Sequence, residues 1–149
     1  MREYNVYIIR EEFASIYYGL ESKLFHLFIE NYESKGKLKE ITTLQINYIS
    51  EQIDKANLDK YLTRHLLKNK GYITDEQKHF LKEKNDRSFA QLVVENHCVK
   101  IKANGLYDAE VTFFELLRNY HSYFLAMDYR SGRYGWLKPI KTLKYANHS

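Results

Sequence analysis

The stretch that decides the fold is Phe124-Leu-Ala-Met-Asp-Tyr-Arg-Ser-Gly-Arg-Tyr-Gly-Trp-Leu-Lys-Pro139, because it places two strand-forming runs on either side of a Ser-Gly turn. We expect a β-hairpin with strands over residues 123–129 and 133–137. Its rings alternate with small residues, as on a sheet face packed by helices, so Phe124, Tyr134 and Trp136 are expected to fill a core behind the sheet. The stretch contains no recognisable catalytic set, which favours a surface that is bound over a site that reacts.

The first half of the chain predicts one strand and several helices. Residues 3–10 alternate with apolar side chains on both sides, which indicates an inner strand with both faces covered. Helical spacing of apolar residues follows. It predicts a short helix from Glu11 to Gly19, a second over 21–32, a third opened by the capping-box spacing of Thr42 and Gln45, and a fourth from Leu58 to Gly71.

The second half predicts more strands. Thr74 and Gln77 repeat the capping-box spacing, which indicates a short charged helix to about Lys84. Runs 89–95 and 98–103 predict a hairpin, and residues 108–120 an amphipathic helix. The order is then strand, three or four helices, hairpin, helix, hairpin. We therefore expect an α+β fold, with a single domain over 1–149 and a mixed sheet of about five strands packed by helices.

Composition limits the compartment and the partners. The net charge of +4 comes from 23 basic and 19 acidic residues, with no block of five or six like charges, so the chain has no dedicated basic arm. The single cysteine, Cys98, has no partner for an intramolecular disulfide. The chain shows no secretory pattern and no apolar run near the roughly 20 residues that cross a bilayer. We expect a cytoplasmic protein without a membrane segment.

The residue pattern gives no sign of catalysis. The six histidines show no paired metal-ligand spacing, and no nucleophile elbow or phosphate loop is present. The carboxylate pairs Glu11–Glu12 and Asp108/Glu110 lie at predicted helix starts, where negative charge stabilises a helix. We therefore expect neither an enzyme nor a bound metal or cofactor.

A nucleic-acid-binding module without catalysis is the alternative interpretation, because the chain is basic and contains 14 tyrosines and 8 phenylalanines. Its candidate patch lies around the last hairpin: Arg130, Arg133, Tyr134, Trp136 and Lys138. Interleaved acidic residues and the lack of an RNA-recognition signature argue against it. We therefore expect no direct contact with nucleic acid.

The predicted first helix carries Phe13 and Tyr17 on one face, and it is too short to persist unless it docks on something. In one interpretation both rings are buried in the core of this protein. In the other, Ile16 and Tyr18 anchor the helix, and Phe13 and Tyr17 are free to bind a partner.

Four stretches resemble one known family. They are Glu-Glu-Phe-Ala (11–14), Tyr-Tyr-Gly-Leu-Glu-Ser (17–22), Phe-Phe-Glu-Leu-Leu-Arg (113–118) and the terminal hairpin, and the likeness is strongest over 4–28 and 105–139. Together they resemble the SirA family, the sporulation inhibitors of replication of endospore-forming bacilli. The resemblance implies an inhibitor that is monomeric when free and acts by occupying domain I of the replication initiator DnaA. It further implies partner contacts by Phe13 and Tyr17, and a polar contact near Gln45 or Asn47.

Overall fold

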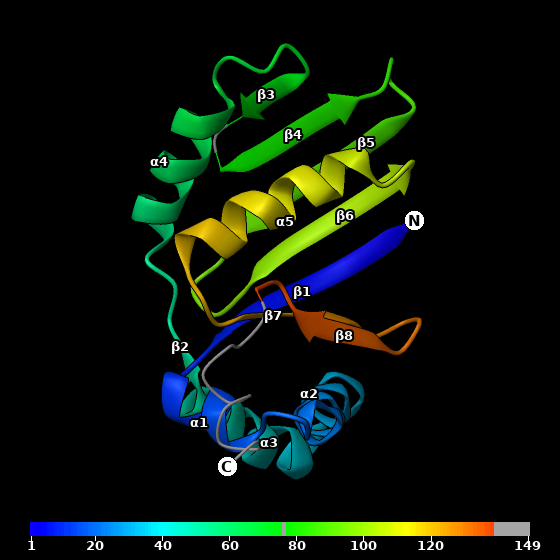
Figure 1. The fold of residues 1–149 in the computed structure, drawn as a ribbon. Coiled ribbons are helices and arrows are strands. Elements are labelled where there is room, and N and C mark those ends of the chain that lie inside the picture. The colour runs from blue at the N-terminus through cyan, green and yellow to red at the C-terminus, as the bar shows by residue number, and fades with distance from the viewer. Residues whose placement is uncertain (76, 139–149) are drawn as a thin grey trace, which may run out of the picture.

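An antiparallel β-sheet runs through the protein in the computed structural model, which describes residues 1–75 and 77–138 (Figure 1). Its strands are β1 (Arg2–Ile9), β2 (Ser50–Glu51), β3 (Tyr72–Asp75), β4 (Lys78–Glu83), β5 (Ser88–Val94), β6 (Val99–Gly105), β7 (Phe124–Asp128) and β8 (Arg133–Trp136). They follow the order β3-β4-β5-β6-β1-β7-β8, and the short β2 pairs with β1. The first strand of the chain thus lies between strands from its far end, as expected for an inner strand.

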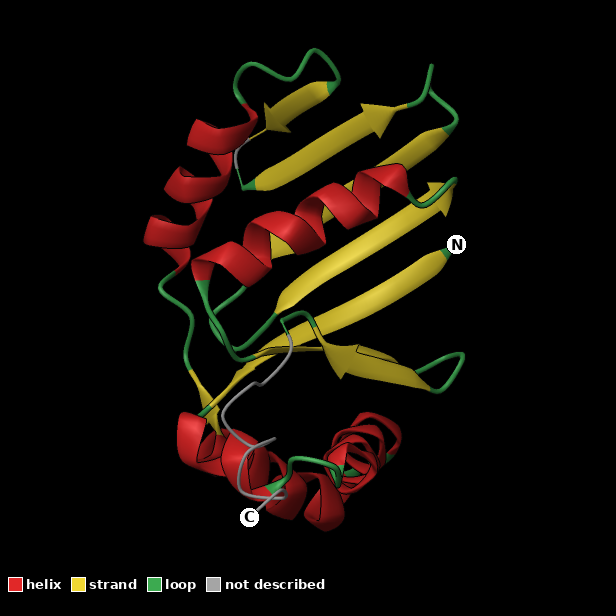
Figure 2. Cartoon of the chain, viewed as in Figure 1, coloured by secondary structure: helices red, strands yellow, loops and turns green. Residues whose placement is uncertain are grey.

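Five helices in the described residues form two groups on opposite faces of this sheet (Figure 2). They are α1 (Glu11–Ile16), α2 (Glu21–Glu33), α3 (Gly36–Ile49), α4 (Lys55–Leu66) and α5 (Asp108–Tyr120). Helices α4 and α5 cover one face and share its apolar core with Val6 and Ile8 of β1. Helices α1 to α3 pack on the other face, where Ile9 belongs to a second core. Because neighbouring residues of β1 enter different cores, its prediction as a strand covered on both faces is confirmed.

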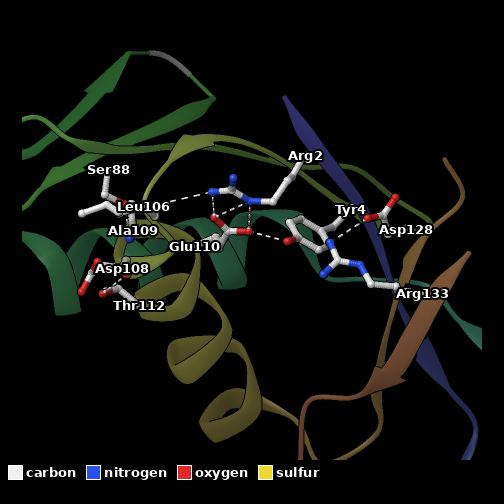
Figure 3. A network of polar contacts seen from close by, with 10 residues as sticks. All are labelled: Arg2, Tyr4, Ser88, Leu106, Asp108, Ala109, Glu110, Thr112, Asp128 and Arg133. Atoms are coloured by element: carbon white, nitrogen blue, oxygen red, sulfur yellow. Dashed lines mark hydrogen bonds and ion pairs between the residues drawn. The ribbon is translucent and has the colours of Figure 1, made fainter. Parts of the chain in front are cut away.

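A buried ion pair fixes α5 to the sheet (Figure 3). Glu110 of α5 is 1% exposed, and its Oε2 accepts a 2.9 Å hydrogen bond from Arg2 Nε on β1 and another from the Tyr4 hydroxyl. Burial, together with the bond to Glu110, raises the pKa of Tyr4 to about 12. The sequence places Glu110 among the solvated acids of a helix start, whereas the structure makes it a core residue whose charge Arg2 balances.

The start of α5 is held by Ser88, a residue of β5. Its hydroxyl accepts a 2.8 Å bond from the Ala109 N–H and donates a 2.6 Å bond to the Leu106 carbonyl. One buried side chain therefore satisfies two backbone groups at the turn into the helix. The predicted bounds of α5, 108–120, are confirmed.

The predicted number of strands and the predicted mixed pairing of the sheet were wrong. The predicted helix over 74–84 is the hairpin of β3 and β4, apart from Glu76, which lies outside the described residues. In β4 the buried His79 and Leu81 alternate with exposed Lys78 and Lys82, so the period is two and not that of a helix. Every strand pairing in the described chain is antiparallel, and the expected mixed sheet of about five strands is an antiparallel sheet of eight.

The predicted start of the third helix was also wrong. Helix α3 already begins at Gly36, whose φ of +63° lies in the region that favours glycine. Thr42 is therefore inside the helix and buried, and its hydroxyl donates a 2.9 Å bond to the Leu38 carbonyl. It also accepts a 2.9 Å bond from Asn31 Nδ2 of α2. The residue expected to cap α3 is a polar contact between two helices.

The terminal hairpin is confirmed in its strands and only partly in its burial; Pro139 lies outside the described residues. Phe124 is fully buried. Tyr134 was wrongly expected in the core, since it is 40% exposed and stacks on Phe25 of α2 with ring centroids 4.9 Å apart. Trp136 is half-buried, and its Nε1 donates a 3.1 Å bond to Glu21 of α2. The hairpin therefore contacts α2 and helps to hold helices α1 to α3 against the sheet.

Candidate interaction surface

Helix α1 is held beside the end of α3 by backbone contacts. The Arg10 N–H donates a 2.9 Å bond to the Ile49 carbonyl, and Arg10 Nε donates a 3.2 Å bond to the Ser50 carbonyl. Ala14 is the fully buried residue of α1. A helix of six residues persists here because its neighbours fix its first turn.

The turn from α1 into α2 fixes the far end of the same helix. Gly19 has a φ of +80°, and its N–H donates a 2.9 Å bond to Glu21 Oε2, the oxygen that also accepts from Trp136. The half-buried Tyr18 packs against the second core, as expected of an anchor. Ile16 does not, because it is 63% exposed. The small residue Ala14 takes the anchoring role that the sequence suggested for Ile16.

Phe13 and Tyr17 lie at the rim of the second core and are both half-buried. Neither interpretation from the sequence holds in full, because the rings are neither sealed inside nor fully exposed. The Phe13 ring packs edge-on against Tyr48 of α3, with centroids 5.3 Å apart at 64°. Tyr48 itself is 69% exposed. Phe13 of α1 and Tyr48 of α3 thus form a pair of packed rings at the surface.

Helix α3 extends this pair into a ridge. Ile41, Leu44 and Tyr48 follow the spacing of one helix side, and they are 46%, 70% and 69% exposed. The exposed Gln45 lies on the same side, four residues after Ile41. We call the α1–α3 surface the set formed by Phe13, Ile16, Tyr17, Ile41, Leu44, Gln45 and Tyr48. It is apolar and aromatic with one amide inside it.

Asn47, the other predicted polar contact, lies elsewhere. It is exposed and lines a polar hollow of about 640 Å³ together with residues of α1 and of the segment after α3. The charged side chains of that hollow are Arg10, Glu11, Glu12 and Glu51, with His97 beside them. The structure therefore brings Gln45 to the ridge and Asn47 to an acidic hollow next to it.

The remaining chemistry-bearing groups are structural or isolated. Within residues 1–75 and 77–138, no three His, Cys, Asp or Glu side chains converge as metal ligands. Burial raises the pKa of Cys98 to about 12, so at neutral pH it is a thiol and not a nucleophilic thiolate. No helix in the described part of the chain has the length and apolar character needed to cross a bilayer.

The patch suggested for nucleic acid on the last hairpin is partly engaged within the protein, because three of its five side chains have partners there, whereas Arg130 and Lys138 are exposed. Arg133 donates a 3.0 Å bond to Asp128, a carboxylate that is itself buried. Trp136 bonds to Glu21 and Tyr134 stacks on Phe25. These side chains connect β8 to its neighbours.

Sequence reasoning missed the apolar ridge. Ile41, Leu44 and Tyr48 do carry a helical signal, since they recur at intervals of three and four residues. The signal was missed because the helix was expected to begin at Thr42, which leaves Ile41 outside it. With the helix starting at Gly36, the same residues form a second apolar side next to that of Thr42 and Ile49.

These features define an α+β protein whose distinctive candidate site is an apolar, aromatic surface on two helices. Comparison with known proteins gives the family. The model of the family described as sporulation inhibitor of replication protein SirA matches residues 2–141. The sporulation inhibitor of replication protein SirA of Bacillus subtilis (strain 168) is 38% identical over 142 residues, which cover 94% of this chain and 95% of that protein. This chain belongs to the SirA family, and the resemblance inferred from its motifs is confirmed.

Proposed function

We propose that this protein inhibits the initiation of DNA replication during sporulation by binding domain I of DnaA through the α1–α3 surface. Membership of a family named for replication inhibition in sporulation supports the process. The observation that carries the site is the exposure of Leu44 and Tyr48, at 70% and 69%, beside the half-buried Phe13. The partner is the one that the family resemblance implies.

Exposed apolar side chains of this kind favour association. Contiguous apolar patches are uncommon on monomers, and those that exist often bind partners. Phe13 and Tyr48 are already packed together, so little side-chain freedom remains to be lost when a partner covers them. A partner of standard interface size would cover roughly 800 Å² on each side. The paired rings would then be the anchors of the interface.

Polar groups around the ridge would set the orientation of the partner. Gln45 lies among the apolar side chains, where an amide can both donate and accept a hydrogen bond. Glu11 and Glu12 border the surface from the first turn of α1. Charged rims of this type affect association rate and specificity more than affinity. We therefore expect a partner that presents an apolar pocket with basic residues near it.

Inhibition would require no chemistry by this protein. Domain I is the module through which DnaA recruits other initiation factors, according to the family resemblance. A partner that covers the docking side of that module blocks assembly at the origin for as long as it is bound. Residence time and concentration would then decide the strength of inhibition.

The test is calorimetric titration of purified DnaA domain I with the protein and its variants. Phe13→Ala and Tyr17→Ala should each weaken binding by about 2 kcal/mol or more, on the order of thirtyfold. Tyr107→Ala is the matched control, because Tyr107 is a 55% exposed ring at the start of α5 and should leave binding unchanged. Circular dichroism checks folding. Equal affinity of both α1 variants and the wild type would defeat the proposal.

The choice between Gln45 and Asn47 has its own test. Gln45 lies one turn from Ile41 and from Tyr48 on α3, whereas Asn47 lines the acidic hollow. Gln45→Ala should therefore cost about 1 kcal/mol of binding, the value of one hydrogen bond, and Asn47→Ala less. A larger loss for Asn47→Ala would move the interface from the ridge to the hollow.

A further inference from the structure

The sheet has a second exposed surface, remote from the α1–α3 surface. The helices packed on β4, β5 and β6 are α4 and α5, and both lie on the face that contains Leu81, Leu92 and Ile101. Because side chains alternate along a strand, the other residues of these strands point to the opposite face. We call this the open face, and it consists of Lys78, Phe80, Lys82, Phe89, Gln91, Val93, Lys100, Lys102 and Asn104.

Strand register arranges these side chains in three rows across the sheet. The rows are Lys82–Phe89–Asn104, Phe80–Gln91–Lys102 and Lys78–Val93–Lys100. Phe80 and Phe89 lie on adjacent strands and are diagonal neighbours, a separation of roughly 7–8 Å in a sheet. Both are half-buried, so part of each ring stays accessible. A lysine stands directly opposite Phe89 on β4.

The open face is basic. All four lysines are exposed, and none of its side chains on β4 to β6 is acidic. Within the described residues the one ion pair that these lysines make joins Lys100 to Glu95, at 3.7 Å and with both side chains about half exposed. Two further acids flank it: Asp75 on β3 stands directly opposite Lys78, and Glu3 on β1 directly opposite Lys102. Four lysines with three acidic neighbours leave the face with a small positive surplus, and within the described residues Lys82, beside Phe89, is the lysine without an acidic side chain opposite or paired with it.

We propose that the open face binds single-stranded DNA. Lysines on either side of two accessible rings match a chain of phosphates that carries stackable bases. A duplex fits poorly, because its bases are already stacked and a flat sheet face does not enter a groove. We commit to DNA because the family acts on replication. This surface is distinct from the patch suggested by the sequence, and it uses lysines of β4 and β6 in place of the engaged Arg133.

Fluorescence anisotropy with a labelled thymidine oligomer of about 20 nucleotides tests the proposal, between about 50 and 200 mM salt. Lys100→Gln with Lys102→Gln should reduce the slope of log affinity against log salt by about 1.4, because each lysine that no longer neutralises a phosphate lowers it by about 0.7. Phe80→Ala and Phe89→Ala should each weaken binding on the order of tenfold. The lysine pair keeps the test decisive if a ring variant folds poorly.

The matched control removes two exposed lysines from other elements, Lys23 of α2 and Lys60 of α4. Lys23→Gln with Lys60→Gln changes the net charge equally and should leave the salt slope unchanged. An equal effect in this control would overturn the proposal, as would no binding at the lowest salt. Tighter binding of duplex DNA, or of RNA of the same sequence, would also overturn it. The open-face variants should retain full affinity for DnaA domain I, so the two proposals fail separately.

Discussion

Helices α5 and α3 are almost equal in length, 13 and 14 residues, and they use their apolar residues in opposite ways. Helix α5 buries Phe113 and Leu117 against the sheet and adds the buried Glu110. Helix α3 buries only Thr42 and Ile49. Four of its large apolar residues, Leu38, Ile41, Leu44 and Tyr48, are 46–70% exposed. Helix α5 thus contributes most of its large apolar residues to the core, whereas α3 keeps most of its own at the surface.

The two helices are therefore expected to differ in what their apolar residues contribute to the free energy of folding. A residue buried in the monomer contributes to the free energy of folding, roughly 1.5–3 kcal/mol for a large apolar side chain. A residue that is 70% exposed, as Leu44 is, contributes little of this. Its apolar character becomes useful only when another molecule covers it. The α5 side should therefore respond to mutation through stability, and the α3 side through affinity.

The largest expected effect is on the α5 side. Phe113→Ala removes a fully buried ring between α5 and the sheet and should cost about 3–5 kcal/mol of unfolding free energy. Tyr48→Ala on α3 also removes a ring, but at 69% exposure it should cost less than about 1 kcal/mol. Urea denaturation measures both. Similar losses from the two variants would erase the distinction between the helices.

A smaller effect is expected from the ion pair beneath α5. Arg2→Ala leaves the Glu110 carboxylate buried without its cation, which should cost about 2–3 kcal/mol, reduced from the usual range because Arg2 is 20% exposed. Adding Glu110→Gln to that variant should recover much of the loss, since a neutral amide is easier to bury. A double-mutant cycle by denaturation gives the coupling. Additive losses would show that the pair does not hold α5.

Several elements could be predicted from the sequence because their signals are local. The bounds of α5 followed from helical periodicity over a full 13 residues, and the hairpins of β5–β6 and β7–β8 from their turn residues. The double coverage of β1 followed from apolar residues on both of its sides. Each of these signals lies within the element that it predicts.

The wrong predictions came from a sequence pattern that fits more than one local structure. Thr74 followed by Gln77 has the spacing of a capping box, yet the Thr74 hydroxyl donates to the Lys78 carbonyl within a hairpin. Thr42 has the same spacing but is a contact between α2 and α3. A short polar side chain can satisfy the backbone of a helix, a turn or a neighbour. Only the contact that the side chain makes in the folded protein distinguishes these three cases, and the local sequence does not show that contact.

The residues of the candidate surface on α1 were named from the sequence, whereas its apolar residues on α3 were not. Phe13 and Tyr17 were found because they share one side of a short predicted helix, and their contact with a partner was implied by the family resemblance and not by the helix pattern. The ridge of Leu44 and Tyr48 depends on where α3 begins, and that boundary was six residues too late: Gly36 against Thr42. The open face was beyond prediction, because it exists only through the register of three strands.

Lowering the pH should destabilise the terminal hairpin, which lies away from α3. Burial raises the pKa of Asp128, but hydrogen bonds from Ser131 and Arg133 outweigh it and the net pKa is lowered. A lowered pKa in the folded state stabilises the protein above the unfolded value, near 3.9, and this contribution is lost as pH falls through the folded value. The protection factors for hydrogen exchange in β7 and β8, which are corrected for the intrinsic slowing of exchange in acid, should therefore fall below about pH 4. Asp128→Asn should remove that pH dependence; if it persists, another carboxylate is responsible.

The smallest expected effect comes from truncating two equally exposed leucines, one at each of two helices. Leu44 on α3 and Leu67 at the end of α4 are 70% and 68% exposed, so truncating either to alanine should change the unfolding free energy by less than about 0.5 kcal/mol. Only Leu44→Ala should weaken binding to DnaA domain I, by about 1 kcal/mol or roughly fivefold, because in the proposed complex only that side chain would become buried. Parallel calorimetric titrations of the two variants measure the difference. Equal affinities would mean that the exposed ridge of α3 is not part of the interface, even if the rings of α1 are.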